Sequence, residues 1–217
     1  EYWVDENTGA LYYRDTGNPD GPYYLNASTT AVFDDVTQDS QVSEMVMVAE
    51  VNGYAYPSLA EAVKAAEDGQ TITMLRDETI ATTEYPEYNL PQNAILDLNG
   101  HTVTVPKMAA IFQGENAIIR NGTFDSNADY SLWIGNGTED TDITIQNVVT
   151  ETGINVFAAN ATLENVTATG KTYYAVWADE GANITIVSGT YASESGTALS
   201  VFAGKDSSGE EDGVDDH

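Results

Sequence analysis

The sequence predicts an all-β fold, a right-handed parallel β-helix of about six rungs with one capping α-helix and a small N-terminal β appendage. Three observations lead to this prediction. Apolar triplets recur about every 22 residues, asparagines recur at two fixed phases of that repeat, and one amphipathic helix precedes the first triplet.

The repeating triplets have the pattern of half-buried strands. Their outer members are apolar and the middle member is usually polar or β-branched, which is the two-residue alternation of a strand with one buried face. The triplets are Ile72–Met74, Leu96–Leu98, Ala117–Ile119, Ile143–Ile145, Ala161–Leu163 and Ile184–Ile186. Leucine-rich repeats have a similar period, but their leucine-dense consensus is absent.

Polar turn residues occupy fixed places beside these triplets. Two positions after a triplet stand Gly100, Asn121, Asn147, Asn165 and Ser188, and just before four of them stand Asn116, Asp142, Asn160 and Asn183. Asparagine tolerates the left-handed backbone conformation and can hydrogen-bond its own turn. We therefore expect asparagine ladders at the corners of a solenoid.

One helix is predicted, over residues 58–69. Ser58 and Glu61 have the spacing of a capping box, and Gly69 provides a stop signal. A single apolar stripe is formed by Leu59, Ala62, Val63 and Ala66. Because the end of a solenoid exposes its core and a strand edge, we expect this stripe to cover the first turn.

The chain divides into three parts. Residues 1–47 are aromatic and rich in turn residues, which indicates a β-meander appendage, and residues 48–203 contain the repeat. Residues 204–217 are acidic with no apolar pattern, as in a linker or disordered tail. The abrupt ends favour a segment of a longer polypeptide.

The composition limits the possible partners and chemistry. The chain has 7 basic and 35 acidic residues, so nucleic acid should be repelled. No apolar run is long enough for membrane insertion. The absence of cysteine excludes thiol catalysis, disulfides and cysteine-bound zinc, and it favours a bacterial exported protein.

A resemblance to a known family supports these expectations. The run Val51–Gly53, the helix signal that starts at Ser58, and the segments 71–75 and 96–102 resemble the start of pectate-lyase-like right-handed parallel β-helix domains. The similarity is greatest to domains in surface proteins of gut-type Gram-positive bacteria, and it covers about residues 48–203. It implies a β-helix at an extracellular or cell-surface location.

A second strand position carries large aromatic residues and forms the candidate ligand site. The residues at this position are Phe112, Trp133, Phe157, Trp177 and Phe202. Residues one and three positions earlier are apolar, and those two earlier are small or polar. Strand alternation therefore predicts that the aromatic column faces outward.

Three arrangements of this column are open. Residues 1–47, which are themselves rich in tyrosine, could fold back over it. The column could instead remain exposed as a platform for glycan or host protein. A bulge could also shift the alternation and turn the aromatic residues inward.

The expected function is a non-catalytic extracellular module, adhesin-like or a spacer. No catalytic residue is assigned, because basic groups that could act in catalysis are scarce. Arg120 is the only arginine well inside the solenoid, and His101 lacks a partner motif. The alternative is a polysaccharide lyase or glycoside hydrolase of the β-helix type, which the resemblance implies. A groove that brings Arg120 or His101 to two carboxylates would favour the enzyme.

No cofactor is predicted, with calcium as the one possible exception. Asp15, Asn18 and Asp20 place oxygen ligands in one glycine-containing loop. The loop lacks the spacing and the terminal glutamate of an EF-hand, so an ordinary turn is the competing interpretation.

Overall fold

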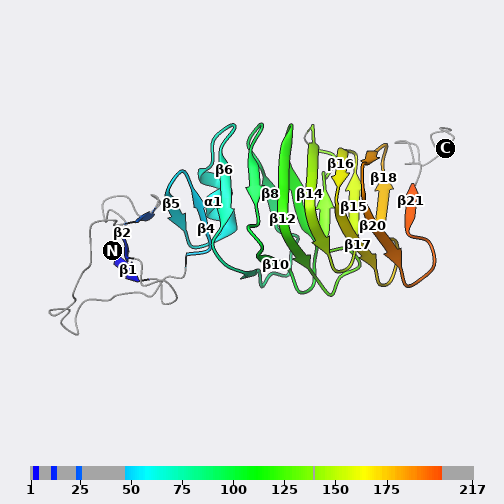
Figure 1. Cartoon of the computed structure of the whole chain (residues 1–217), viewed down its shortest axis with the longest axis horizontal. Helices are drawn as coiled ribbons and strands as arrows, with labels where there is room; N and C mark the ends of the chain where they lie inside the picture. Colours follow the sequence, from blue (N-terminus) through cyan, green and yellow to red (C-terminus); the bar gives the residue numbers. More distant parts are fainter. Residues whose placement is uncertain (1, 5–10, 14–22, 26–46, 139, 202–217) are drawn as a thin grey trace.

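The computed structural model describes residues 2–4, 11–13, 23–25, 47–138 and 140–201. Parallel strands stack side by side along the long axis of the molecule and form a β-helix of about six turns (Figure 1). One short helix accompanies them in the described residues. The predicted nearly all-β solenoid is confirmed.

The long sheet contains the predicted triplets. Its parallel strands are β6 (Thr71–Met74), β9 (Ile95–Asp97), β12 (Ala117–Asp125), β14 (Asp142–Thr150), β16 (Asn160–Glu164) and β19 (Asn183–Ile186). Further strands of the same coil are β7 (Glu78–Thr79), β10 (Thr102–Thr104), β17 (Val166–Gly170) and β20 (Gly189–Ser193).

The pairing in this sheet differs from the expected alignment at one step. Leu96 pairs with Ile119, two positions beyond Ala117, which was its expected partner. A shift of two positions keeps the same side chains facing inward, because strand alternation has a period of two. The predicted buried face is therefore retained.

The short sheet forms a second wall of the coil. Its strands are all parallel: β8 (Glu87–Asn89), β11 (Ala110–Gln113), β13 (Leu132–Ile134), β15 (Ile154–Phe157), β18 (Val176–Asp179) and β21 (Leu199–Val201).

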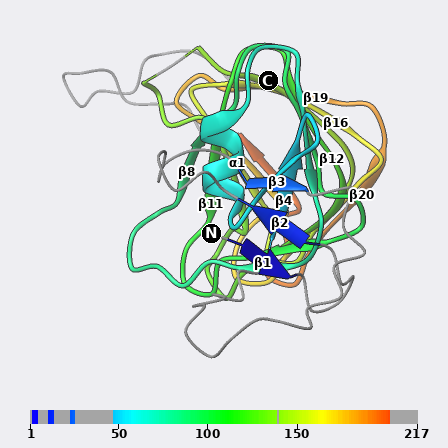
Figure 2. The same ribbon diagram turned by 90° about the vertical axis from the view of Figure 1, so that its left-hand side faces the viewer.

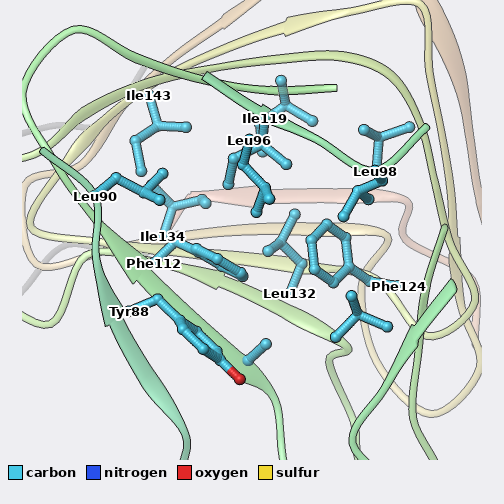
Figure 3. Close-up of a cluster of buried hydrophobic side chains, with 14 of the residues drawn as sticks. Tyr88, Leu90, Leu96, Leu98, Phe112, Ile119, Phe124, Leu132, Ile134 and Ile143 are labelled. Carbon is cyan, nitrogen blue, oxygen red and sulfur yellow. The ribbon is translucent and has the colours of Figure 1, made fainter. Parts of the chain in front are cut away.

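Side chains from both sheets fill the interior. Figure 3 shows Phe112 beside Leu132 and Ile134, with Phe124 close by. The ring of Phe112 stacks on Tyr88 with centroids 4.8 Å apart and meets Phe124 edge-on at 5.5 Å. This apolar interior is the main source of stability for the solenoid.

Helix α1 (Leu59–Ala65) covers the first turn. The Ser58 hydroxyl accepts a hydrogen bond from the Glu61 N–H at 3.2 Å, which confirms the predicted N-cap. Leu59, Ala62 and Val63 are buried in the core. Viewed along the solenoid axis, α1 lies beside β8 at the N-terminal end (Figure 2).

The helix is shorter than the predicted range 58–69. Ala66 already has an extended backbone, with ψ of 147°. The next residues form a turn, closed by a 3.1 Å hydrogen bond from the Gln70 N–H to the Glu67 carbonyl. Gly69, with φ of 74°, serves this turn rather than the end of the helix.

An antiparallel extension precedes α1. Strands β4 (Ala49–Val51) and β5 (Tyr54–Tyr56) form a hairpin that joins β6. Short strands β3 (Tyr23–Leu25), β2 (Leu11–Tyr13) and β1 (Tyr2–Val4) continue the same sheet in antiparallel fashion (Figure 1). The rest of residues 1–46 and the tail 204–217 lie outside the described residues.

Asparagine ladders stand at the corners, as predicted. Asn165 Nδ2 donates to Asn147 Oδ1 at 2.8 Å, and Asn147 Nδ2 donates to Asn121 Oδ1 at 3.2 Å. In the second ladder, Asn183 Nδ2 donates to Asn160 Oδ1 at 3.1 Å.

No helix in the described ranges is long and apolar enough to cross a membrane.

Candidate functional site

The five aromatic residues do not form one column, so the predicted alignment is wrong. Phe112 pairs with Ile134, the residue after Trp133, and is fully buried. The partner of Trp133 on that strand is Ile111. An offset of one position places a side chain on the opposite face of a strand. The inward arrangement therefore holds for Phe112, whose side chain lies in the core.

Two of the five residues share a line on the outer face of the short sheet. Trp133 pairs with Asn155, and Asn155 pairs with Trp177. The two indoles therefore leave the sheet two strands apart, about 10 Å along the solenoid axis. Both are half-buried.

Phe157 also faces outward, two positions further along its strand. It pairs with Asp179, and its ring meets Trp133 edge-on at a centroid distance of 6.3 Å. A Cβ on Gly137 would lie 3.2 Å from this ring, so the absence of a side chain there gives Phe157 its place. Phe202 lies outside the described residues.

A groove of about 470 Å³ runs over this face. Its aromatic lining residues are Tyr85, Tyr130, Trp133 and Trp177. Tyr85 meets Trp133 edge-on at 5.6 Å, and Tyr130 lies against Trp177 at 5.7 Å with the rings tilted by 33°. These ring contacts hold the two indoles in place in the groove lining.

Two residues that line this groove each have a buried polar atom with no hydrogen-bond partner among the described residues. These atoms are the indole nitrogen Nε1 of Trp133 and the amide oxygen Oδ1 of Asn155. Asn155 is only 1% exposed although it is on the outer face of the sheet, where it lies between two tryptophan positions. A buried polar group without a partner costs about 1–3 kcal/mol, so these two atoms destabilise the free protein.

The groove carries little net charge. Lys107 and Asp129 are the charged residues in its lining. Burial raises the pKa of the Tyr130 phenol, so this side chain stays neutral at physiological pH. The lining therefore suits an uncharged ligand with a polar edge and an apolar face.

The described N-terminal strands pair into the long sheet and not into the short sheet. Strands β1, β2 and β3 extend the long sheet beyond β5, whereas both tryptophans of the groove belong to the short sheet. The prediction that residues 1–47 cover the aromatic residues concerns segments mostly outside the described residues.

Arg120 is used in a structural ion pair. Its Nε lies 2.9 Å from Asp97 Oδ2, and Asp97 also accepts hydrogen bonds from the Asn99 N–H and the Asn121 amide. Burial disfavours the charged form of Asp97, but these three partners outweigh it and lower its pKa. The carboxylate is therefore held in its charged form as part of a corner.

His101 has a similar role at a neighbouring corner. Its Nδ1 lies 3.2 Å from Asp77 Oδ1, which also accepts the Thr102 N–H at 2.9 Å. The Thr102 hydrogen bond is the main cause that lowers the pKa of Asp77, and His101 adds to it. Within the described residues, Arg120 and His101 each face one carboxylate, and neither lines the aromatic groove.

The candidate calcium loop with Asp15, Asn18 and Asp20 lies outside the described residues. In the part of the chain that the structure does describe, no group of three or more acidic or histidine side chains could hold a metal ion.

Sequence reasoning missed Tyr85, Tyr130 and Asn155 as members of the site. Tyr130 stands three positions before Trp133, at an apolar position that strand alternation places on the inner face, but it contacts Trp177 in the groove. A signal for Asn155 was available, because it stands midway between Trp133 and Trp177 in the sequence, one repeat period from each.

Comparisons with protein-family models, with curated proteins and with solved structures found no match to this chain. The function is therefore inferred from the groove and the fold themselves.

Proposed function

We propose that the protein is a non-catalytic extracellular module that binds an uncharged polysaccharide along the outer face of the short sheet. The observation that carries this proposal is the groove that contains Trp133 and Trp177 in one line. An adhesin-like role at a bacterial cell surface is consistent with the lack of cysteine and with the resemblance of the sequence to surface β-helix domains.

Stacking is the physical basis for choosing a sugar. A pyranose ring has an apolar face of C–H groups and a polar edge of hydroxyl groups. An indole offers a large, rigid apolar surface at low entropic cost. Because the two indoles are separated along the solenoid axis, a linear chain that follows this axis contacts both.

The charges favour an uncharged chain over a polyuronate. The protein has a formal net charge of −28, so an anionic polysaccharide is repelled. Lys107 is one basic group in the groove, and Asp129 offsets it.

The same lining favours binding over hydrolysis. Glycosidases generally need two carboxyl groups that flank the scissile bond. Asp129 is the one carboxylate among the residues that line the described groove. Arg120 and His101, the two residues considered for catalysis, do not line the groove.

Trp177→Ala tests the proposal. Isothermal titration against cellohexaose, mannohexaose and laminarihexaose should detect binding of at least one of them to the wild type. The variant should bind that sugar about tenfold more weakly, because removal of the indole leaves the apolar face of the sugar exposed to water, at about 25 cal/mol per Å² of apolar surface. Its melting temperature should change little, since Trp177 is half-buried at the surface.

Tyr54→Ala provides a control, because Tyr54 is a partly exposed aromatic residue on β5 that does not line the groove. It should leave the affinity unchanged. A wild type that binds none of the three sugars, or a Trp177→Ala variant that binds as well as the wild type, would refute the proposal. Release of new reducing ends from any of them would instead show an enzyme.

A further inference from the structure

The two unpartnered atoms of the groove form a complementary pair. The Nε1 of Trp133 is a hydrogen-bond donor, and the Oδ1 of Asn155 is an acceptor. The two residues are register partners on β13 and β15, so their backbones lie about 4.8 Å apart. An unpartnered donor and an unpartnered acceptor therefore belong to side chains that leave neighbouring strands at the same level of the short sheet.

A single oxygen atom can satisfy both groups. A hydroxyl group can accept one hydrogen bond and donate another through the same atom. With both bonds at about 2.9 Å and a tetrahedral angle between them, the donor and acceptor atoms must lie about 4.7 Å apart, a separation that side chains of neighbouring strands can reach. A carboxylate would lack the proton that Asn155 Oδ1 requires, and an ammonium group would lack the acceptor that Trp133 requires.

We propose that Trp133 Nε1 and Asn155 Oδ1 together bind one hydroxyl group of the polysaccharide and thereby select a neutral sugar unit in the groove. This inference rests on the proposed function and adds the specificity-determining pair. The indole of Trp133 then has two roles, since its ring supplies apolar surface and its N–H positions the hydroxyl. The cost of burying the two atoms in the free protein is recovered when the sugar binds.

Access to the pair requires a side chain to move. Both atoms are shielded from solvent in the free protein. Tyr85 is 48% exposed and meets the Trp133 ring edge-on, so it is the aromatic lining residue with the most freedom to rotate away. The groove therefore opens at Tyr85 when the sugar enters.

The test combines affinity with stability. Trp133→Phe keeps an aromatic ring and removes the donor, and Asn155→Leu keeps the approximate volume and removes the acceptor. Each variant should bind the hexasaccharide preferred by the wild type about tenfold more weakly, which corresponds to about 1.4 kcal/mol. Their melting temperatures should be unchanged or higher, because each substitution removes a buried atom that has no partner.

Two further variants sharpen the result. The double variant should lose little more affinity than either single variant, because one hydroxyl serves both side chains. Trp177→Phe makes the same ring exchange two strands away, where the indole nitrogen is not among the buried atoms without partners, and should lose less affinity than Trp133→Phe.

The possible outcomes separate the two proposals. If the wild type binds a hexasaccharide and Trp133→Phe binds it within twofold of the wild type, the hydroxyl pair is wrong and the proposed function stands. If the wild type binds none of the sugars, both fail. A drop in melting temperature for Trp133→Phe that is much larger than the drop for Trp177→Phe would show that the Trp133 N–H already has a partner in the free protein, which also refutes the pair. If Asn155→Leu fails to fold, the result for Trp133→Phe alone decides whether the hydroxyl pair is correct.

Discussion

At the residue scale, asparagine has two tasks at the corners of this β-helix. Asn147 adopts a left-handed backbone with φ of 54°, and its side chain bridges the asparagines above and below it. Few residues other than glycine tolerate the left-handed backbone conformation. Glycine tolerates it best, but it has no side chain to form the ladder hydrogen bonds.

Substitution of Asn147 separates these tasks. Asn147→Ala should lower the free energy of unfolding by about 2 kcal/mol or more, because it imposes left-handed strain and removes two side-chain hydrogen bonds. Asn147→Gly should cost less, since glycine relieves the strain. Urea denaturation of the three proteins measures both effects, and a glycine variant less stable than the alanine variant would contradict this division.

The ladders were predictable from sequence because they depend on residue type at a fixed phase. The groove was only partly predictable. Trp133 and Trp177 were identified as outward-facing candidates, but Phe112 was assigned to the same column although it lies in the core. A difference of one residue in the length of a turn decides between the two faces, and composition does not reveal that length.

At the element scale, turn lengths in the long sheet vary while its buried face is kept. The step along the sequence between register partners is much shorter from Ile145 to Leu163 than from Ile119 to Ile145. In the short sheet, by contrast, the step from Trp133 to Asn155 equals the step from Asn155 to Trp177. The register places these three outward side chains in one line, and all three line the groove.

Helix α1 shows why element boundaries are harder to predict than element type. The predictions of the apolar stripe and of the N-cap at Ser58 were both correct, but the helix ends at Ala65, before the predicted stop at Gly69. The Leu59 N–H is bound by a distant carboxylate, since Glu78 Oε2 accepts it at 3.1 Å. Such long-range partners are absent from local sequence patterns.

Removal of the cap should weaken the first turn. Ser58→Ala leaves the Glu61 N–H without its acceptor and should lower the free energy of unfolding by about 1 kcal/mol. Ser58→Asp should retain most of the stability, because aspartate is also a good N-cap. Chemical denaturation monitors the loss, and equal stability of the alanine variant and the wild type would show that Glu78 alone is enough to cap the helix.

At the scale of the whole molecule, the repeat determines the architecture and the surface determines the function. The period and the corner residues were sufficient to predict a parallel β-helix, because each turn must bury the same face against the next. The groove also needs Tyr85 and Tyr130, which come from turns that do not repeat. The repeat pattern of the sequence does not predict that such side chains come together, because their positions depend on how the turns fold.

The central claim is that the groove with Trp133 and Trp177 is where the sugar binds. The sequence contains three tryptophans, so the side-chain indole region of a ¹H–¹⁵N correlation spectrum should contain three signals, and tryptophan-to-phenylalanine variants assign them. Titration with the preferred hexasaccharide should shift the signals of Trp133 and Trp177, with Trp133 moving downfield as its N–H gains an acceptor. The signal of Trp3 should stay in place. Binding that leaves both groove signals unchanged would contradict the account.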